Sequence, residues 1–140
     1  VWASGAGTEI VLKKMTVEEC QWSGVFVREG AKLVATECHF HQNGQIGVSV
    51  HGSTTTARLT NCTSHHNKGN GVYAHSGAVV DLMGEQTSVH DNERHGLYAC
   101  DDGTINVYQP CVLNDMSHGN KGQNIYEQDG GIVQQKDSMK

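Results

Sequence analysis

The sequence contains a single proline, Pro110, and only 6 % aromatic residues among its 140 residues. Its longest purely apolar runs, such as Val25-Phe26-Val27, are far too short to form a transmembrane helix. Basic residues are also scarce, since 10 Lys and Arg stand against 15 Asp and Glu and leave a net charge of −5. That balance argues against a surface for nucleic acid or an anionic membrane. We therefore expect neither nucleic acid nor a membrane among the partners.

The cysteines form no CxxC pair, and their spacing fits neither a zinc site nor a small disulfide scaffold. Free thiols in a reducing compartment are the favoured interpretation, which leans towards an intracellular location. One sequon, Asn61-Cys62-Thr63, points weakly to secretion, so the localisation stays open. Cys38 and Cys62 fall in a column with Met15 and Thr87 that we expect to face the core. Cys100 is expected to face outward as a candidate reactive thiol.

Glycine is abundant, with 17 residues, and four of them mark an internal repeat. The anchors Gly24, Gly47, Gly71 and Gly96 lie 23, 24 and 25 residues apart, and Asn124 takes the fifth place 28 residues further on. Two more columns keep this register. An asparagine precedes the anchor by four residues and a histidine by six, at Asn43, Asn67, Asn92 and Asn120 and at His41, His65, His90 and His118. Four matches in each column are hard to obtain by chance.

Within each repeat, apolar residues alternate with polar or aromatic ones at the period of a β-strand. Three such runs occur per repeat, and turns rich in Gly, Asn and Asp separate them. No stretch shows a convincing helical pattern. Three short strands in about 24 residues cannot close a core alone, so successive repeats must stack. We predict an all-β parallel β-helix of about five coils, with three short strands per coil, that forms a single domain over residues 1–140.

A family resemblance rests on the pattern Cys/apolar-x-apolar-His-Asp-Asn-x-x-x-Gly-apolar-Tyr-apolar. Val89-His90-Asp91-Asn92 followed by Gly96-Leu97-Tyr98 resembles the repeats of right-handed, pectin-lyase-like β-helix proteins. It is most similar to repeats in F-box proteins that carry a carbohydrate-binding/sugar-hydrolase-type β-helix domain. The resemblance covers roughly residues 7–133 and implies a right-handed coil with a substrate groove on one outer sheet. The F-box relatives imply substrate recognition for ubiquitin ligation, although no F-box segment occurs in this sequence.

The repeated columns have chemical consequences of their own. Stacked Asn side chains are expected to form a structural ladder that ends at Cys20, which replaces Asn in the first copy. The anchor glycine fits a sharp turn that needs positive φ. Zinc ligands must converge on one centre, whereas a straight row of His points its rings in parallel, so we expect no metal site and no cofactor. Protonation of that row creates repulsion, which predicts acid sensitivity.

The outward face of the strand after the anchor is the best functional candidate. Flat rings beside His and Asp suit an extended sugar chain or a peptide. The alternative is that exposed aromatics only stabilise the parallel sheet. The candidate ligand-binding residues are Phe26, His51, Tyr73, His75, Tyr98, Asp101, Asp102 and Tyr126.

Catalysis is disfavoured by the arrangement of charged residues. Glycoside cleavage needs two carboxylates across one bond, and Asp101 and Asp102 are adjacent. Lyase or epimerase chemistry needs a base and a positive charge, and Arg28 falls about three coils from Tyr98. Tyr98-Ala-Cys-Asp101 resembles only part of an alginate epimerase motif.

We therefore predict a non-catalytic β-helix repeat module that recognises a polysaccharide or a partner protein through its outward Tyr/His face. The alternative is a polysaccharide lyase, epimerase or glycoside hydrolase that uses Tyr98, His75 and Asp101, and a structural spacer is a third. We assign no catalytic residue. Both ends of such a coil would expose unpaired strand edges, so the chain is expected to be a fragment of a longer one. Its oligomeric state stays open.

Overall fold

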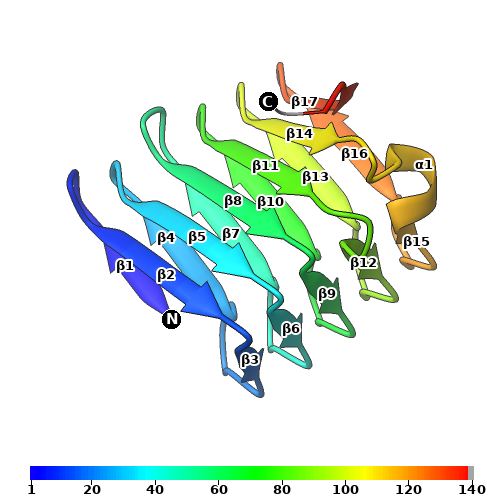
Figure 1. The fold of residues 1–140 in the computed structure, drawn as a ribbon, viewed down its shortest axis with the longest axis horizontal. Coiled ribbons are helices and arrows are strands. Elements are labelled where there is room, and N and C mark those ends of the chain that lie inside the picture. The colour runs from blue at the N-terminus through cyan, green and yellow to red at the C-terminus, as the bar shows by residue number, and fades with distance from the viewer. Residues whose placement is uncertain (139–140) are drawn as a thin grey trace.

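The computed structural model describes residues 1–138 and consists almost entirely of short strands. Each strand pairs in parallel with its copies in the neighbouring coils (Figure 1). Three sheets therefore run along the molecule, with strand orders β1-β4-β7-β10-β13-β16 (sheet A), β17-β14-β11-β8-β5-β2 (sheet B) and β15-β12-β9-β6-β3 (sheet C). The architecture is a parallel β-helix, as the repeat predicts.

The strand bounds follow the repeat. Sheet A contains β1 (Trp2–Ser4), β4 (Val25–Arg28), β7 (Val48–His51), β10 (Val72–His75), β13 (Leu97–Cys100) and β16 (Ile125–Gln128). Sheet B contains β2 (Glu9–Lys13), β5 (Lys32–Thr36), β8 (Thr56–Thr60), β11 (Val79–Met83), β14 (Thr104–Tyr108) and β17 (Ile132–Lys136). Sheet C contains β3 (Thr16–Glu18), β6 (His39–His41), β9 (Thr63–His65), β12 (Ser88–His90) and β15 (Ser117–His118).

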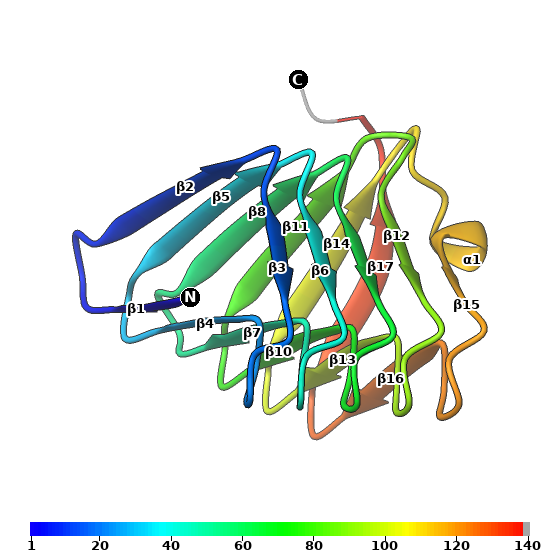
Figure 2. The ribbon, with the colours of Figure 1, turned by 90° about the horizontal axis from the view of Figure 1, so that it is seen from below.

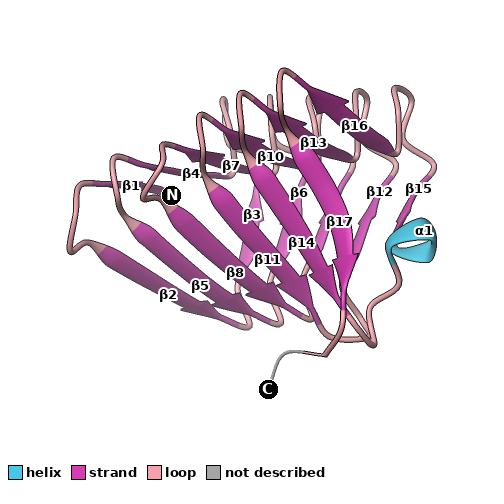
Figure 3. Cartoon of the chain, turned by 90° about the horizontal axis from the view of Figure 1, so that it is seen from above, coloured by secondary structure: helices cyan, strands magenta, loops and turns pink. Residues whose placement is uncertain are grey.

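The chain completes five coils of three strands and adds two strands of a sixth, which extends the prediction of about five coils. The pattern predicts neither β1 nor β17, because Ala3 and Val133 are their only fully inward residues and no alternating apolar pair forms. One helical turn, α1 (Leu113–Met116), lies in the longer fifth coil beside β15, so the expectation of no helix is wrong there (Figure 3). Within residues 1–138, no helix has the length and apolar character needed to cross a membrane.

The core is the space enclosed by the three sheets (Figure 2). Inward residues of successive coils stack on one another, as in the row Val25, Val48, Val72 and Leu97. The largest side chains that are fully buried there are Phe40, Leu33, Leu59, Leu82, Leu97 and Ile105. Cys38, Cys62 and Thr87 are buried as expected, whereas Met15 is 48 % exposed because it lies in the first coil, beside the last strand of sheet C, β3. All five cysteines are free.

The Asn column forms the predicted ladder. The Nδ2 atoms of Asn43, Asn67 and Asn92 each donate to the Oδ1 atom one coil further on, at 3.0, 2.9 and 2.9 Å. The ladder begins where the Cys20 amide donates to Asn43 Oδ1. At the other end Asn120 Nδ2 donates to Oδ1 of Asn124, the residue that occupies the anchor position of that coil. The ladder thus satisfies buried polar groups along the whole turn between sheets C and A.

The anchor glycines are required for a different reason from the predicted one. Gly24, Gly47, Gly71 and Gly96 lie outside the left-handed region, so the expectation of positive φ is wrong. Space is the constraint, since a Cβ at Gly71 would lie 2.7 Å from Asn92 Nδ2 and 3.0 Å from the Gly96 carbonyl oxygen. Glycine therefore lets successive coils close on the Asn ladder.

Candidate functional site

The outward face of sheet A carries two rows of side chains along the solenoid axis, which we call the aromatic face. The register aligns one row as Trp2, Phe26, Ser49, Tyr73, Tyr98 and Tyr126. The adjacent row is Ser4, Arg28, His51, His75, Cys100 and Gln128. The structure therefore brings together six of the eight predicted site residues on strands of one sheet, and their role in binding stays a prediction.

The rings of the aromatic face contact one another from coil to coil. The centroids of Tyr73 and Tyr98 lie 4.9 Å apart and those of Tyr98 and Tyr126 lie 5.0 Å apart. His51 continues the contacts, 5.1 Å from His75 and 4.9 Å from Phe26. The Tyr98 hydroxyl donates to Gln128 Oε1. Because these contacts repeat at about the spacing of parallel strands, the face is a continuous ribbon of rings.

Three rings of the face are neutral near pH 7. Burial, together with the Cys100 thiol, raises the pKa of Tyr73 and of Tyr98 to about 12, so both phenols stay protonated. Burial also lowers the pKa of His51, and the charges of His75 and Arg28 add to this effect. The His51 ring, whose Nε2 lies 3.0 Å from Ser49 Oγ, therefore remains a neutral imidazole. These three rings therefore offer hydrogen bonds rather than charge.

The side chains of the two predicted aspartates, Asp101 and Asp102, point in different directions. Both lie in the turn after β13 with left-handed backbone conformations, at φ 47° for Asp101 and 63° for Asp102. Asp101 reaches back to the preceding coil, where its Oδ2 lies 2.9 Å from His75 Nε2. The carboxylate of Asp102 packs over Gly130 of the following coil. Only Asp101 therefore joins the aromatic face.

Sequence reasoning missed three rings near this face. Trp2 and Trp22 are 62 % and 63 % exposed, and with Phe26 they line a hollow of about 450 Å³ beside the first two coils. His95 stacks on Tyr126 with the centroids 4.3 Å apart. Trp2 stands 24 residues before Phe26, one repeat away, and that spacing could have identified it. Trp22 and His95 lie in loop positions without a recurring residue type, so no periodic signal marks them.

The His column lies on sheet C and at its strand ends, on a different side from the aromatic face. The rings of His41, His65, His90 and His118 stack with centroid distances of 4.9, 4.9 and 5.2 Å and interplanar angles of 4°, 1° and 6°. This confirms the predicted row of parallel imidazoles. Glu18 contacts the ring of His41 at 3.0 Å, and Asp91 contacts that of His90 at 2.8 Å. The row therefore has acidic partners beside two of its members.

Acidification is expected to destabilise the fold through His65. Burial lowers the pKa of His65 to about 4, and the neighbouring rings of His90 and His41 add to the effect. In the unfolded chain the same group titrates at about 6.5, so between these values only the unfolded state takes up the proton. From pH 7.5 to 5 we expect a loss of about 1–2 kcal/mol, less than the full pKa difference implies because solvent screens the half-exposed ring.

Urea unfolding at the two pH values measures this effect. The His65→Gln variant should show a smaller loss on acidification, whereas His75→Gln, on the other face, should retain most of it. Equal unfolding midpoints for the native sequence at both pH values would contradict the expectation.

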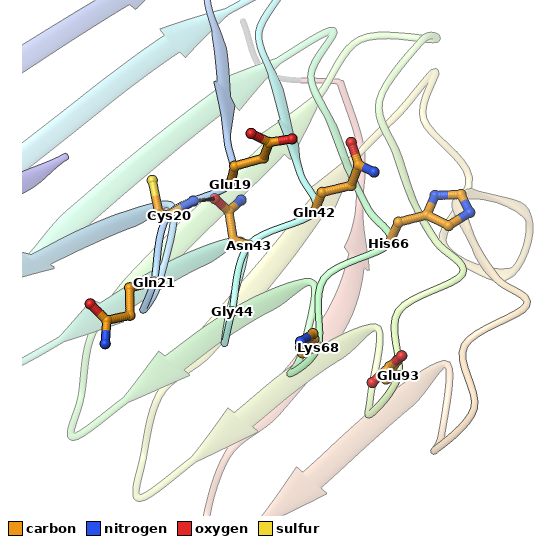
Figure 4. Close-up of a pocket in the computed structure, with 9 residues that line it drawn as sticks. All are labelled: Glu19, Cys20, Gln21, Gln42, Asn43, Gly44, His66, Lys68 and Glu93. Carbon is orange, nitrogen blue, oxygen red and sulfur yellow. Dashed lines mark hydrogen bonds between the residues drawn. The ribbon is translucent and has the colours of Figure 1, made fainter.

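A larger hollow of about 550 Å³ lies beside the turns that carry the Asn ladder (Figure 4). Glu19, His66, Lys68 and Glu93 contribute side chains of mixed charge from successive coils, and Figure 4 shows that these do not converge on one point. Asn43 is already engaged with the Cys20 amide. This hollow therefore has fewer features of a binding site than the aromatic face.

Comparison with known proteins gives a family match. A family model described as "Right handed beta helix region" matches residues 1–137, a range that includes all three sheets. No curated protein matches the chain, and no solved structure matches it. The match gives the coil its right-handed sense and names neither a ligand nor a reaction.

Proposed function

Since the chain belongs to the family of right-handed β-helix regions, we propose that it is a non-catalytic, pectin-lyase-like repeat module that binds an extended polysaccharide along its aromatic face. The observation that carries the proposal is the ribbon formed by Tyr73, Tyr98 and Tyr126, with centroids 4.9 and 5.0 Å apart. Flat apolar ring faces beside fixed hydrogen-bonding groups suit the alternating apolar and hydroxyl surfaces of sugars. A linear ribbon suits a linear ligand.

The hollow next to Phe26 extends this argument to one end of the face. Its volume of about 450 Å³ falls within the usual range of ligand sites, about 300–1,000 Å³. Trp22 and Gln45 supply a large ring and an amide there. The hollow could therefore hold a terminal or branching sugar of a chain that lies along the ribbon.

A partner protein is the second candidate for the same face. Exposed Trp and Tyr residues are typical of the residues that dominate protein interfaces, and Trp2 and Trp22 are both more than 60 % exposed. The resemblance to β-helix domains of F-box proteins would make such a partner a substrate of ubiquitin ligation.

Two observations weigh against the catalytic alternative. A Tyr98 phenol with a pKa of about 12 is a poor general base near neutral pH. Arg28 on β4 lies three strands from Tyr98 on β13, which is about 14 Å at the usual strand spacing. The two side chains therefore cannot act on one sugar unit.

The proposal is tested by isothermal titration of the protein with a panel of neutral and uronate polysaccharides. Each polysaccharide is also assayed for new chain ends after incubation with the protein, which detects cleavage. Tyr73→Ala should weaken the binding of whichever polysaccharide the native protein binds at least tenfold, since one stacking ring contributes on the order of 1.4 kcal/mol to the binding free energy. Tyr108→Ala, which removes a half-buried Tyr from sheet B, is the matched control and should bind normally.

Three results would count against the proposal. Turnover that Tyr98→Phe abolishes would establish the catalytic alternative. Unchanged affinity in Tyr73→Ala would place the ligand elsewhere. Absence of binding to every polysaccharide, together with capture of a defined protein through Trp22, would favour the protein partner.

A further inference from the structure

Three potential metal ligands meet at the carboxyl ends of β10 and β13. His75 and Cys100 are register partners in adjacent coils, and Asp101 follows Cys100 in the turn. One ligand atom from each side chain lies within 4.8 Å of the other two, and within residues 1–138 this is the one such group of three His, Cys, Asp or Glu side chains. We propose that His75, Cys100 and Asp101 bind a divalent transition-metal ion, with Zn²⁺ as the best fit.

The ligand types favour zinc. An imidazole nitrogen, a thiolate and a carboxylate oxygen are its three usual protein ligands, and hard ions such as Mg²⁺ and Ca²⁺ avoid sulfur. Tetrahedral zinc with bonds of about 2.0–2.3 Å holds its ligand atoms about 3.3–3.6 Å apart. His75 Nε2 and Asp101 Oδ2 are already 2.9 Å apart, and the 49 % exposed Asp101 side chain can shift to admit the ion. The fourth position would be open to solvent.

Ser76 completes the arrangement around His75. Its Oγ lies 2.6 Å from His75 Nδ1. A zinc-bound imidazole donates its other N–H to an acceptor that orients the ring, and the Ser76 hydroxyl can accept that bond. When no ion is bound, the same hydroxyl can donate to Nδ1 while Nε2–H donates to Asp101. The histidine is therefore held in place in both states.

Cys100 occupies an unusual position for a thiol in this chain. Its side chain alternates outward on β13, as predicted, yet it is only 7 % exposed because neighbouring groups cover it. Cys38 and Cys62, in contrast, lie in the apolar core. Tyr73 and Tyr98 lie beside Cys100 on the same face. The Cys100 sulfur is therefore directed towards His75 and Asp101 rather than towards the apolar core.

Binding has a defined proton balance. The Cys100 S–H bond breaks, a sulfur–metal bond forms, and the thiol proton passes to the solvent. His75 Nε2–H no longer donates to Asp101, because Nε2 loses its proton and binds the ion. The imidazole proton moves to Nδ1, and Nδ1–H donates a hydrogen bond to the Ser76 hydroxyl oxygen. This site does not depend on polysaccharide binding, and its test contains no polysaccharide.

The test is a titration of the reduced, folded protein with Co²⁺, followed by competition with Zn²⁺. We expect one Co²⁺ per chain, with a thiolate-to-cobalt charge-transfer band and visible d–d bands that Zn²⁺ abolishes. Cys100→Ser and His75→Gln should lose the charge-transfer band, and Asp101→Asn should weaken Co²⁺ binding at least tenfold. Cys20→Ser removes a half-buried thiol far from the cluster and should behave as the native sequence.

Calorimetry in two buffers of different ionisation enthalpy should show release of about one proton for each Zn²⁺ bound near pH 7. Circular dichroism checks that each variant is folded, and the exposed Asp101 provides a substitution that does not disturb the core. The proposal is overturned if the charge-transfer band survives in Cys100→Ser, if it is absent from the native protein, or if Asp101→Asn binds Co²⁺ as tightly as the native sequence.

Discussion

Replacing Asn67 by alanine is expected to lower the free energy of unfolding by about 3–5 kcal/mol. Asn67 is completely buried and lies in the middle of the ladder. Its Nδ2 donates to Asn92 Oδ1 and to the Phe40 carbonyl oxygen, while its Oδ1 accepts from both the amide and the Nδ2 of Asn43. Alanine removes these four bonds and a fifth from Nδ2 to Ser64 Oγ, and leaves the buried Asn43 amide without this acceptor. A cavity adds to the cost.

Urea unfolding followed by circular dichroism measures this loss as a lower midpoint with an unchanged slope. Asn114→Ala is the matched control, because Asn114 is exposed in α1 and should change stability by less than about 0.5 kcal/mol. Equal stability of Asn67→Ala and Asn114→Ala would show that the ladder does not stabilise the coil.

Gly71→Ala is expected to be comparably destabilising, by about 3 kcal/mol or more. The added methyl group would crowd Val89 Cγ1, Asn92 Nδ2 and the Gly96 carbonyl oxygen, which all belong to the next coil. To relieve this crowding, either the Asn ladder must shift or β10 and β13 must move apart. Both responses break inter-coil hydrogen bonds, so the effect should exceed that of an ordinary small-to-large change.

Gly7→Ala separates the effect of space from that of backbone conformation. Gly7 has a φ of +84° and open space where its Cβ would stand, so alanine there costs only local strain, about 1 kcal/mol. If Gly71→Ala proves no more destabilising than Gly7→Ala in the same urea experiment, the close approach of the coils is not what selects glycine at the anchors.

Much of the fold could be predicted because residues one repeat apart in the sequence of a solenoid stack on one another in adjacent coils. Once the anchors were aligned, Asn43, Asn67 and Asn92 had to lie one above another, and the structure confirms this. The anchor glycines were identified for the wrong reason, since collisions between coils are invisible in one repeat. The terminal strands β1 and β17 escaped detection because the apolar alternation weakens there.

The candidate site was predictable along each row but not between rows. Register alone placed Tyr73 beside Tyr98 and His75 beside Cys100. It could not show that Asp101 turns back to His75 while Asp102 turns towards Gly130, because this depends on the left-handed conformation of both residues in the turn. It also could not show that Cys100, although directed outward, is covered by its neighbours.

The most direct test of polysaccharide recognition is NMR chemical-shift mapping with the tightest-binding member of the panel. We expect the perturbed amide and ring signals to follow β10, β13 and β16, with the largest changes at Tyr73, Tyr98 and Tyr126. Signals of the stacked histidines on sheet C should stay in place. Perturbations confined to sheet B or sheet C, with the three tyrosines unchanged, would contradict the assignment of the aromatic face as the ligand surface.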